Sequence, residues 1–308
     1  MAANCKNASN SFLTNAMPFI ALLACLMLIS ASVVKMVFDF DTPANLGSTV
    51  NSPANEASPN ISPDGLSLYF QSDRSGGSGG WDLWVTKRKK ISDAWSTPMN
   101  LGQIINSSVD ETSPNISTDN LTLYFSSNRV GGYGDFDIWK VTRQTVNDPW
   151  GTPMNLGRIV NSFFSEGPSS MSSNGLELYL GSNRTGGFGD YDLWVTTRAT
   201  IMDDWCKPVN LGLSVNITSS DWGPSISADG LSLCFESSRK GGYPGDELWI
   251  IMRETADDPW GIPINLGSTI NSQFTEATPS ISSDGQELFF QSNRSGGQGN
   301  SDIWIAIR

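Results

Sequence analysis

One sequence unit, written five times, limits what this chain can fold into. A Leu-Gly pair marks each copy at the same place, and successive pairs lie 55 residues apart without insertion or deletion. The pairs are Leu46-Gly47, Leu101-Gly102, Leu156-Gly157, Leu211-Gly212 and Leu266-Gly267. A fixed period of this length predicts a repeat architecture in which every copy builds the same small structural unit.

Each copy has the pattern of antiparallel strands. Residues 66–71 alternate apolar and more polar side chains, and this period of two is typical of a strand. Asp64-Gly65 precedes that strand, and we expect it to form a two-residue hairpin turn. Further strands are predicted at 58–62, before the turn, at 82–85 and at about 95–101. Four strands per copy predict an all-β fold, a five-bladed β-propeller of four-stranded antiparallel blades.

The ends of the chain complete each other in this scheme. The last copy reaches its third strand and stops at Arg308, without the segment that carries Pro-x-Asn-Leu-Gly. That segment stands at residues 40–47 instead, where Phe40 takes the place of the tryptophan found in the other copies. We therefore expect this N-terminal strand to close the ring, which removes open edge strands.

The repeat resembles a known family. Its pattern Pro-x-Ile-Ser-x-Asp-Gly-Leu-x-Leu-Tyr-Phe-x-Ser-Asn-Arg-x-Gly-Gly is similar to the WD-repeat-like β-propeller repeat of TolB-type bacterial proteins, over about residues 40–308. The resemblance implies a bacterial secreted or periplasmic propeller that binds other molecules, and it brings no catalytic residues. TolB has six blades whereas this chain has five copies, so no TolB partner carries over.

The first 35 residues stand outside the repeat. Residues 17–34 carry no charge and are rich in Leu, Ile, Ala and Met. We expect residues 1–35 to be a cleaved signal peptide or an N-terminal membrane anchor, and residues 36–308 to form the propeller. The protein is then exported to the periplasm, cell surface or exterior, and only residues 17–34 could hold it at a membrane.

Composition narrows the partners. The net charge is −12, histidine is absent and no basic patch occurs, so nucleic acid is excluded as a partner. The acidity favours basic partners or cations. Without histidine the usual general base is missing. We predict no cofactor, no bound metal and a monomer. Gly/Asp loops such as 131–137 resemble calcium loops, but their aspartates are expected to accept backbone N–H groups.

A ring of acids is the first candidate site. The five residues are equivalent positions at the start of each innermost strand, and they should circle the axis at one end: Glu56, Glu111, Glu166, Asp221 and Glu276. Like charges in a ring would attract a cation or ligand. The alternative is a structural lattice with the equivalent arginines, which begin with Arg74.

Aromatic residues on one face are the second candidate. The two longer connections of each blade must emerge on the same side of the disc, and we name this side the long-loop face. Its candidate binding residues are Trp81, Tyr133, Phe136, Phe188, Tyr191, Trp222 and Tyr243. Aromatic rings beside planar polar groups suit sugars or protein hot spots. The alternative is that the rings cover their own glycine-rich loops.

We predict a binding or scaffold protein without catalytic activity, which recognises a protein or a surface carbohydrate through the long-loop face. A two-carboxylate site needs two different environments, and nearly identical copies supply equivalent ones. The alternative is a glycan-active hydrolase near the fourth blade, where the pattern breaks most and Asp221 and Glu236 would act. A structural or assembly protein of the cell envelope is the third hypothesis.

Overall fold

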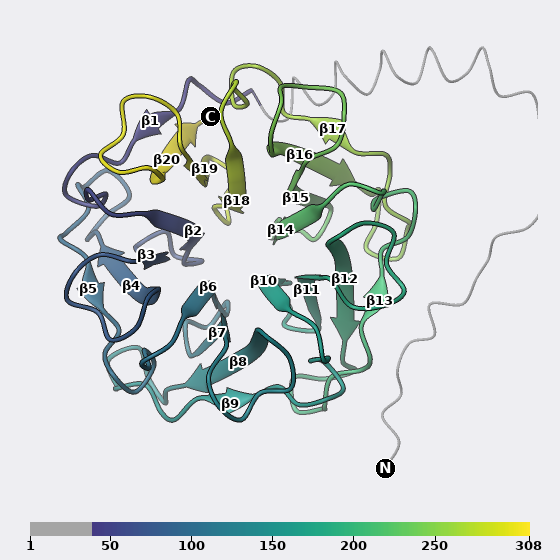
Figure 1. Cartoon of the computed structure of the whole chain (residues 1–308), viewed down its shortest axis with the longest axis horizontal. Coiled ribbons are helices and arrows are strands. Elements are labelled where there is room, and N and C mark those ends of the chain that lie inside the picture. Colours follow the sequence, from purple (N-terminus) through teal and green to yellow (C-terminus); the bar gives the residue numbers. More distant parts are fainter. Residues whose placement is uncertain (1–38) are drawn as a thin grey trace, which may run out of the picture.

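A computed structural model describes residues 39–308 as a closed ring of five sheets around a central axis (Figure 1). Every sheet has four antiparallel strands, and the described part of the chain contains no helix. The predicted five-bladed all-β propeller is confirmed. Accordingly, no helix within residues 39–308 is long and apolar enough to cross a membrane. The predicted signal or anchor at residues 1–35 lies outside the described residues and stays a prediction.

The strands follow the sequence order from the axis outwards. Blade 1 consists of β2 (Glu56–Ile61), β3 (Ser67–Ser72), β4 (Asp82–Lys87) and β5 (Met99–Asn100). Blade 2 consists of β6 (Glu111–Ile116), β7 (Thr122–Ser127), β8 (Asp137–Thr142) and β9 (Met154–Asn155). Blade 3 consists of β10 (Glu166–Met171), β11 (Glu177–Ser182), β12 (Asp192–Thr197) and β13 (Val209–Asn210). Blade 4 consists of β14 (Asp221–Ile226), β15 (Ser232–Ser237), β16 (Glu247–Met252) and β17 (Ile264–Asn265). Blade 5 consists of β18 (Glu276–Ile281), β19 (Glu287–Ser292), β20 (Asp302–Ile307) and β1 (Ala44–Asn45).

The two ends of the chain meet in blade 5, as predicted. Strand β1 pairs with β20, and Ala44 lies opposite Ile305. A second contact closes the ring near the axis, where the backbone N–H of Ile61 in blade 1 donates to Ser280 Oγ of blade 5 at 3.1 Å. Equivalent bonds join the innermost strands of the other neighbouring blades. Each blade keeps an outer edge strand of only two residues, which is too short to offer another chain an extended edge.

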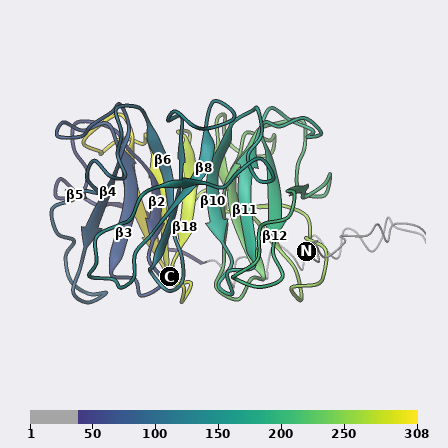
Figure 2. The ribbon, with the colours of Figure 1, turned by 90° about the horizontal axis from the view of Figure 1, so that it is seen from below.

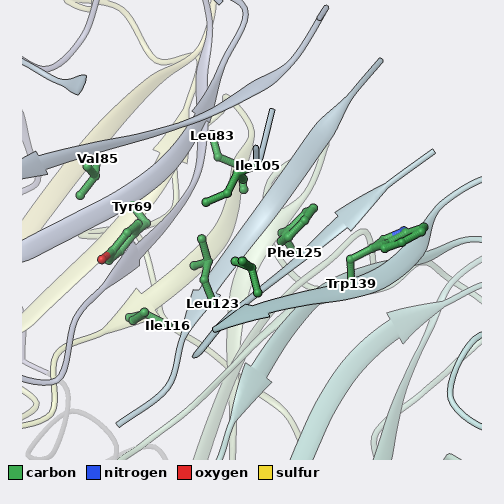
Figure 3. Packing of buried hydrophobic residues seen from close by; sticks show 9 residues of the cluster. Tyr69, Leu83, Val85, Ile105, Ile116, Leu123, Phe125 and Trp139 are labelled. Atoms are coloured by element: carbon green, nitrogen blue, oxygen red, sulfur yellow. The ribbon is translucent and has the colours of Figure 1, made fainter. Parts of the chain in front are cut away.

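Packing between blades supplies the core. The strands of each blade run from one face of the disc to the other (Figure 2). Each side of a blade therefore packs against a neighbouring blade. Strand β3 accordingly buries Leu68 and Phe70 and also the intervening Tyr69. Figure 3 shows one such boundary, where Tyr69 and Leu83 of blade 1 face Leu123 and Phe125 of blade 2. Alternation in the sequence thus marks two different blade neighbours, not a core side and a solvent side.

The hairpin turn differs from the prediction. The backbone N–H of Ser62 donates to the carbonyl oxygen of Ser67 and closes the hairpin, so four residues form the loop instead of two. Of the Asp64-Gly65 pair only Gly65 has a positive φ, at 69°, whereas the predicted turn requires two positive angles. A β-bulge in β2 between residues 57 and 60 then sets the register and places Glu56 opposite Ser72. The outermost strand is also shorter than expected, at Met99–Asn100.

Candidate functional site

The ring of acids is part of the structural framework. All five side chains are fully buried at 0% exposure. Each one pairs with an arginine of its own blade at 2.5 to 2.9 Å between nitrogen and oxygen. The pairs are Glu56 with Arg74, Glu111 with Arg129, Glu166 with Arg184, Asp221 with Arg239 and Glu276 with Arg294. The geometry is that of the acid–arginine lattice, the structural alternative named in the sequence analysis. None of the five carboxylates lines the cavity on the axis that is described below.

The aspartates of the glycine-rich loops also have structural partners. Asp137 Oδ2 accepts the backbone N–H of Tyr133 at 2.6 Å and the side-chain amide of Asn155 at 2.8 Å. Asp82, Asp192 and Asp302 accept the equivalent backbone bonds. Within residues 39–308, no group of three or more acidic, cysteine or histidine side chains is arranged to hold a metal ion. The loops are therefore held by their own aspartates.

A cavity of about 580 Å³ lies on the axis at the long-loop end, and we name it the axial cavity. Its wall comes from the inner strands and loops of all five blades. Farther along the axis a ring of prolines, with Pro59, Pro114 and Pro279 among its members, narrows the space to about 20 Å³. The cavity is therefore a bowl that narrows strongly at its floor, a shape that suits a small ligand.

Aromatic side chains line one part of this bowl. They come from blades 1 to 4: Trp81, Phe136, Tyr191 and Trp222. Trp222 packs edge-on against Tyr191 with ring centroids 4.3 Å apart. The tryptophan fits only because two glycines lie beneath it, since a Cβ on Gly167 would come within 1.8 Å of the ring and one on Gly181 within 2.3 Å. These two glycines are therefore the complement of Trp222.

Polar side chains that bridge neighbouring blades also line the bowl. They occupy equivalent positions in three blades, and each accepts a backbone N–H group from the next blade around the ring. The bonds are Gln71 Oε1 with Ser113 N at 2.8 Å, Gln291 Oε1 with Ser58 N at 3.3 Å and Glu236 Oε2 with Thr278 N at 2.6 Å. Two amides and one carboxyl group thus reach the cavity from fixed positions.

The donors of these bonds have an unusual backbone. Ser58, Ser113 and Thr278 adopt φ angles of 48°, 53° and 44°, next to the bulge of each innermost strand. Residues with a Cβ rarely enter this region, and each case costs about 1 kcal/mol or more. Strain of this kind gathers at binding sites, and here it surrounds the axial cavity.

The other two blade boundaries lack the bridge. In blade 2 the bridging position is Ser126, and its neighbour is Pro168, which has no N–H group to donate. In blade 3 the position is Gly181, beneath the Trp222 ring. The five copies are therefore not equivalent at the axis.

Glu236 is the carboxyl group of the axial cavity. Burial raises its pKa to about 8, and the charge of Asp246 adds to the shift, whereas the hydrogen bond from Thr278 opposes it. Burial also raises the pKa of Asp246. The predicted pair of Asp221 and Glu236 is not brought together in the cavity, because Asp221 belongs to the buried lattice with Arg239. Asp246 is the acid that acts on Glu236.

Sequence reasoning missed Asp246 and the two bridging glutamines. The signal was present in the repeat columns: Asp246 is equivalent to Trp81, Phe136 and Tyr191, and Glu236 is equivalent to Gln71 and Gln291. The cavity is built at columns where the copies differ, whereas the residues that all copies share form the framework.

A second hollow of about 470 Å³ lies between blades 2 and 3, and we name it the side groove. Tyr133 lines it together with Phe163 and Phe164, and Arg158 and Lys207 contribute positive charge. Two other predicted aromatics, Phe188 and Tyr243, are partly exposed and line neither hollow. The seven predicted aromatics are thus divided among the axial cavity, the side groove and the open surface.

Solved structures of other proteins share this fold. The catalytic domain of an α-L-arabinofuranosidase from Coprinopsis cinerea matches with a TM-score of 0.56 at 11% identity, over 87% of this chain and 97% of that chain. An α-L-arabinofuranosidase from Lactobacillus brevis matches with a TM-score of 0.56 at 13% identity, over 82% and 90%. A putative TolB from Agrobacterium tumefaciens matches with a TM-score of 0.49 at 16% identity, over 87% and 90%.

These likenesses show the shared fold and transfer no activity. No known protein-family profile matches the chain, and no curated protein matches it in sequence. TolB proteins occur among the structural matches, yet membership of the TolB-type repeat family stays a prediction.

The prediction that the chain is not an enzyme is wrong as an inference from fold and symmetry. Glycoside hydrolases have the same fold at TM-scores of 0.55 to 0.56. The expected equivalence of the five copies also fails in the fourth blade, where burial raises the pKa values of Glu236 and Asp246 and the other blades have no carboxyl group at either position. The propeller of this chain is therefore compatible with binding and with catalysis.

Proposed function

We propose that the axial cavity binds a carbohydrate. The observation that carries this proposal is that one bowl combines aromatic rings with amide and carboxyl groups held in fixed positions. A sugar ring has an apolar face of C–H groups and a rim of hydroxyls. The face packs on an aromatic ring such as Trp81 or Trp222, while the hydroxyls exchange hydrogen bonds with Gln71, Gln291 and Glu236.

The charge of the wall favours this ligand over others. Among residues 39–308, no lysine or arginine lines the axial cavity. Phosphorylated ligands and nucleotides need cationic or backbone donors that neutralise their charge, so they fit poorly here. A volume of about 580 Å³ falls in the range of about 300–1,000 Å³ that is usual for small-ligand sites. A deep bowl also suits a short sugar better than a flat protein surface.

Hydrolysis of the bound glycan is the second candidate, and the environment of Glu236 favours it. A carboxyl group with a pKa of about 8 keeps its proton at neutral pH, as a general acid must. In this scheme Glu236 gives its proton to the glycosidic oxygen as the bond to the anomeric carbon breaks. Water adds to that carbon, and Asp246 accepts the proton which the water loses.

Binding measurements on a panel of oligosaccharides test the first candidate. An α-L-arabinofuranosidase of the same fold, from Podospora anserina, was solved with cellotriose, so cellotriose and arabinose-bearing oligosaccharides belong in the panel. We expect Trp81→Ala and Trp222→Ala each to weaken binding about tenfold, or about 1.4 kcal/mol. Tyr243→Ala is the control, because Tyr243 is 43% exposed and lies outside the cavity. A panel without any binder, or equal losses in all three variants, would refute the proposal.

Turnover separates the two candidates. If the protein hydrolyses a glycan that it binds, Glu236→Gln should abolish release of the product while affinity changes less than about threefold, because Gln keeps the acceptor for Thr278. Undiminished turnover in Glu236→Gln would exclude Glu236 as the acid. A wild-type protein that binds glycans and releases no product would leave binding as the function.

We also propose that the propeller acts outside the cytoplasm. The apolar stretch at residues 17–34, which has the character of an export signal, supports this proposal. Fractionation of cells that express the full chain tests this, with a variant carrying Leu22→Arg and Leu23→Arg as the control. Export of the wild type and retention of the control are expected, and cytoplasmic wild-type protein would contradict the proposal.

A further inference from the structure

The side groove is lined by positively charged side chains, although the protein as a whole is acidic. The chain has 31 acidic and 19 basic residues, yet in the part that the structure describes no acid lines the groove. Arg184 at its wall is already paired with Glu166. Arg158 and Lys207, in contrast, form no ion pair with a carboxylate within residues 39–308. Two cations without acidic partners in such a chain indicate an anionic ligand.

Aromatic rings hold one of these cations in place. The guanidinium carbon of Arg158 lies 5.0 Å from the centre of the Tyr133 ring and 5.8 Å from that of Phe163. Both distances are within the range of a cation–π contact. The arginine is thus oriented before any ligand arrives. Phe163 is 76% exposed, which leaves an apolar surface next to the charge.

Only this blade boundary has the combination. The residues equivalent to Arg158 in the other copies are Ser48, Gln103, Leu213 and Ser268. The residues equivalent to Lys207 are Thr42, Thr97, Thr152 and Ile262. The acid–arginine pairs that hold the framework recur in all five blades, whereas these two cations occur at one boundary only.

The side groove and the axial cavity are neighbours. Phe164 lines the groove and the next residue, Ser165, lines the cavity, so one short loop separates the two. A linear ligand that occupies the cavity can reach the groove across this loop. Both places offer aromatic surface, but they differ in charge: the cavity contributes Glu236, and the groove contributes Arg158 and Lys207.

We propose that the ligand is an anionic glycan, with a sugar in the axial cavity and an acidic group, a carboxylate or a sulfate, on Arg158 and Lys207. This inference rests on the proposed carbohydrate-binding function. The planar guanidinium pairs with either acid through two parallel hydrogen bonds, and the exposed Phe163 ring packs on the sugar that bears it.

An array of neutral, uronic-acid and sulfated oligosaccharides, with acidic peptides on the same surface, tests the inference with the full chain. We expect acidic glycans to bind about tenfold better than neutral glycans of the same length at low salt, and the advantage to shrink when salt is raised. The uronic-acid and sulfated arms distinguish the carboxylate from the sulfate. Methyl esters of the uronic acids should bind like the neutral glycans.

Variants assign the effect to the groove. Arg158→Gln with Lys207→Gln should remove the tenfold advantage and leave affinity for neutral glycans unchanged. Lys240→Gln is the matched control, an exposed cation at the position equivalent to Thr185 of the groove. Equal binding of acidic and neutral glycans, or an advantage that survives the double variant, would overturn this inference while leaving the proposed function intact. Binding of acidic peptides alone, or of nothing on the array, would overturn both.

Discussion

Replacement of Glu236 by Gln should change how the stability of the protein depends on pH. The pKa of Glu236 is raised from 4.5 to about 8 in the folded protein. Below pH 4.5 the carboxyl group is protonated in both the folded and unfolded states, so it adds no pH dependence. As the pH rises towards 8 the unfolded chain loses this proton while the folded protein keeps it, which favours unfolding. The wild-type protein therefore loses stability over this interval, and the loss is complete above the folded pKa.

The magnitude follows from the size of the shift. A full conversion at about 1.4 kcal/mol per pKa unit gives on the order of 5 kcal/mol. Glu236 borders an open cavity and is only partly buried, so water reduces the penalty. We expect a difference of about 2 kcal/mol in the free energy of unfolding between Glu236→Gln and wild type above pH 8, and almost none near pH 4. Gln is accepted at the equivalent Gln71 and Gln291 of blades 1 and 5, so the substitution fits the fold.

Urea unfolding followed by tryptophan fluorescence between pH 4 and pH 9 measures this difference. Glu254→Gln is the control, since Glu254 is an exposed residue of the same blade and should leave the pH profile as in wild type. Parallel profiles for Glu236→Gln and wild type would refute the raised pKa, and with it the assignment of Glu236 as a proton donor at neutral pH.

Three further substitutions test the framework around the cavity. Gly181→Ser should destabilise the protein by about 2 kcal/mol, because the new Cβ would meet the Trp222 ring. The same substitution should cost little in a Trp222→Ala background. A double-mutant cycle should therefore give a coupling energy of at least about 1 kcal/mol. Arg129→Ala should cost about 3 kcal/mol or more in chemical denaturation because it leaves a buried carboxylate without its partner. Ser113→Gly should stabilise by about 0.5–1 kcal/mol because glycine accepts its φ of 53° without strain, whereas Ser169→Gly, in the next blade, should destabilise. Additive effects in the cycle, a neutral Arg129→Ala or a destabilising Ser113→Gly would each contradict the structure described.

The architecture could be read from the sequence because a repeat states its own period. The five copies at a fixed spacing predicted five blades. The displaced segment at residues 40–47 predicted that the ring closes through the pairing of β1 with β20. The prediction of a two-residue hairpin turn was wrong because Asp-Gly fits more than one type of turn. The four-residue loop and the bulge after Ala57 depend on packing against the next blade, which no local pattern reports.

The candidate site was harder to predict for a physical reason. Shared residues such as Glu56 and Arg74 are needed at every boundary, and they proved to be framework. A single ligand on the axis of a ring meets all five blades at once, so its contacts must come from positions at which the copies differ. Trp222 and Glu236 are such positions, and only the fold places them around one cavity, with Asp246 close enough to act on Glu236.

A crystal structure of the protein soaked with the oligosaccharide that binds best on the array tests the central claim most directly. The account predicts a sugar ring in the axial cavity, packed on Trp81 or Trp222 and hydrogen-bonded to Glu236 or the bridging glutamines. A sugar bound elsewhere, with the axial cavity filled by solvent alone, would contradict it.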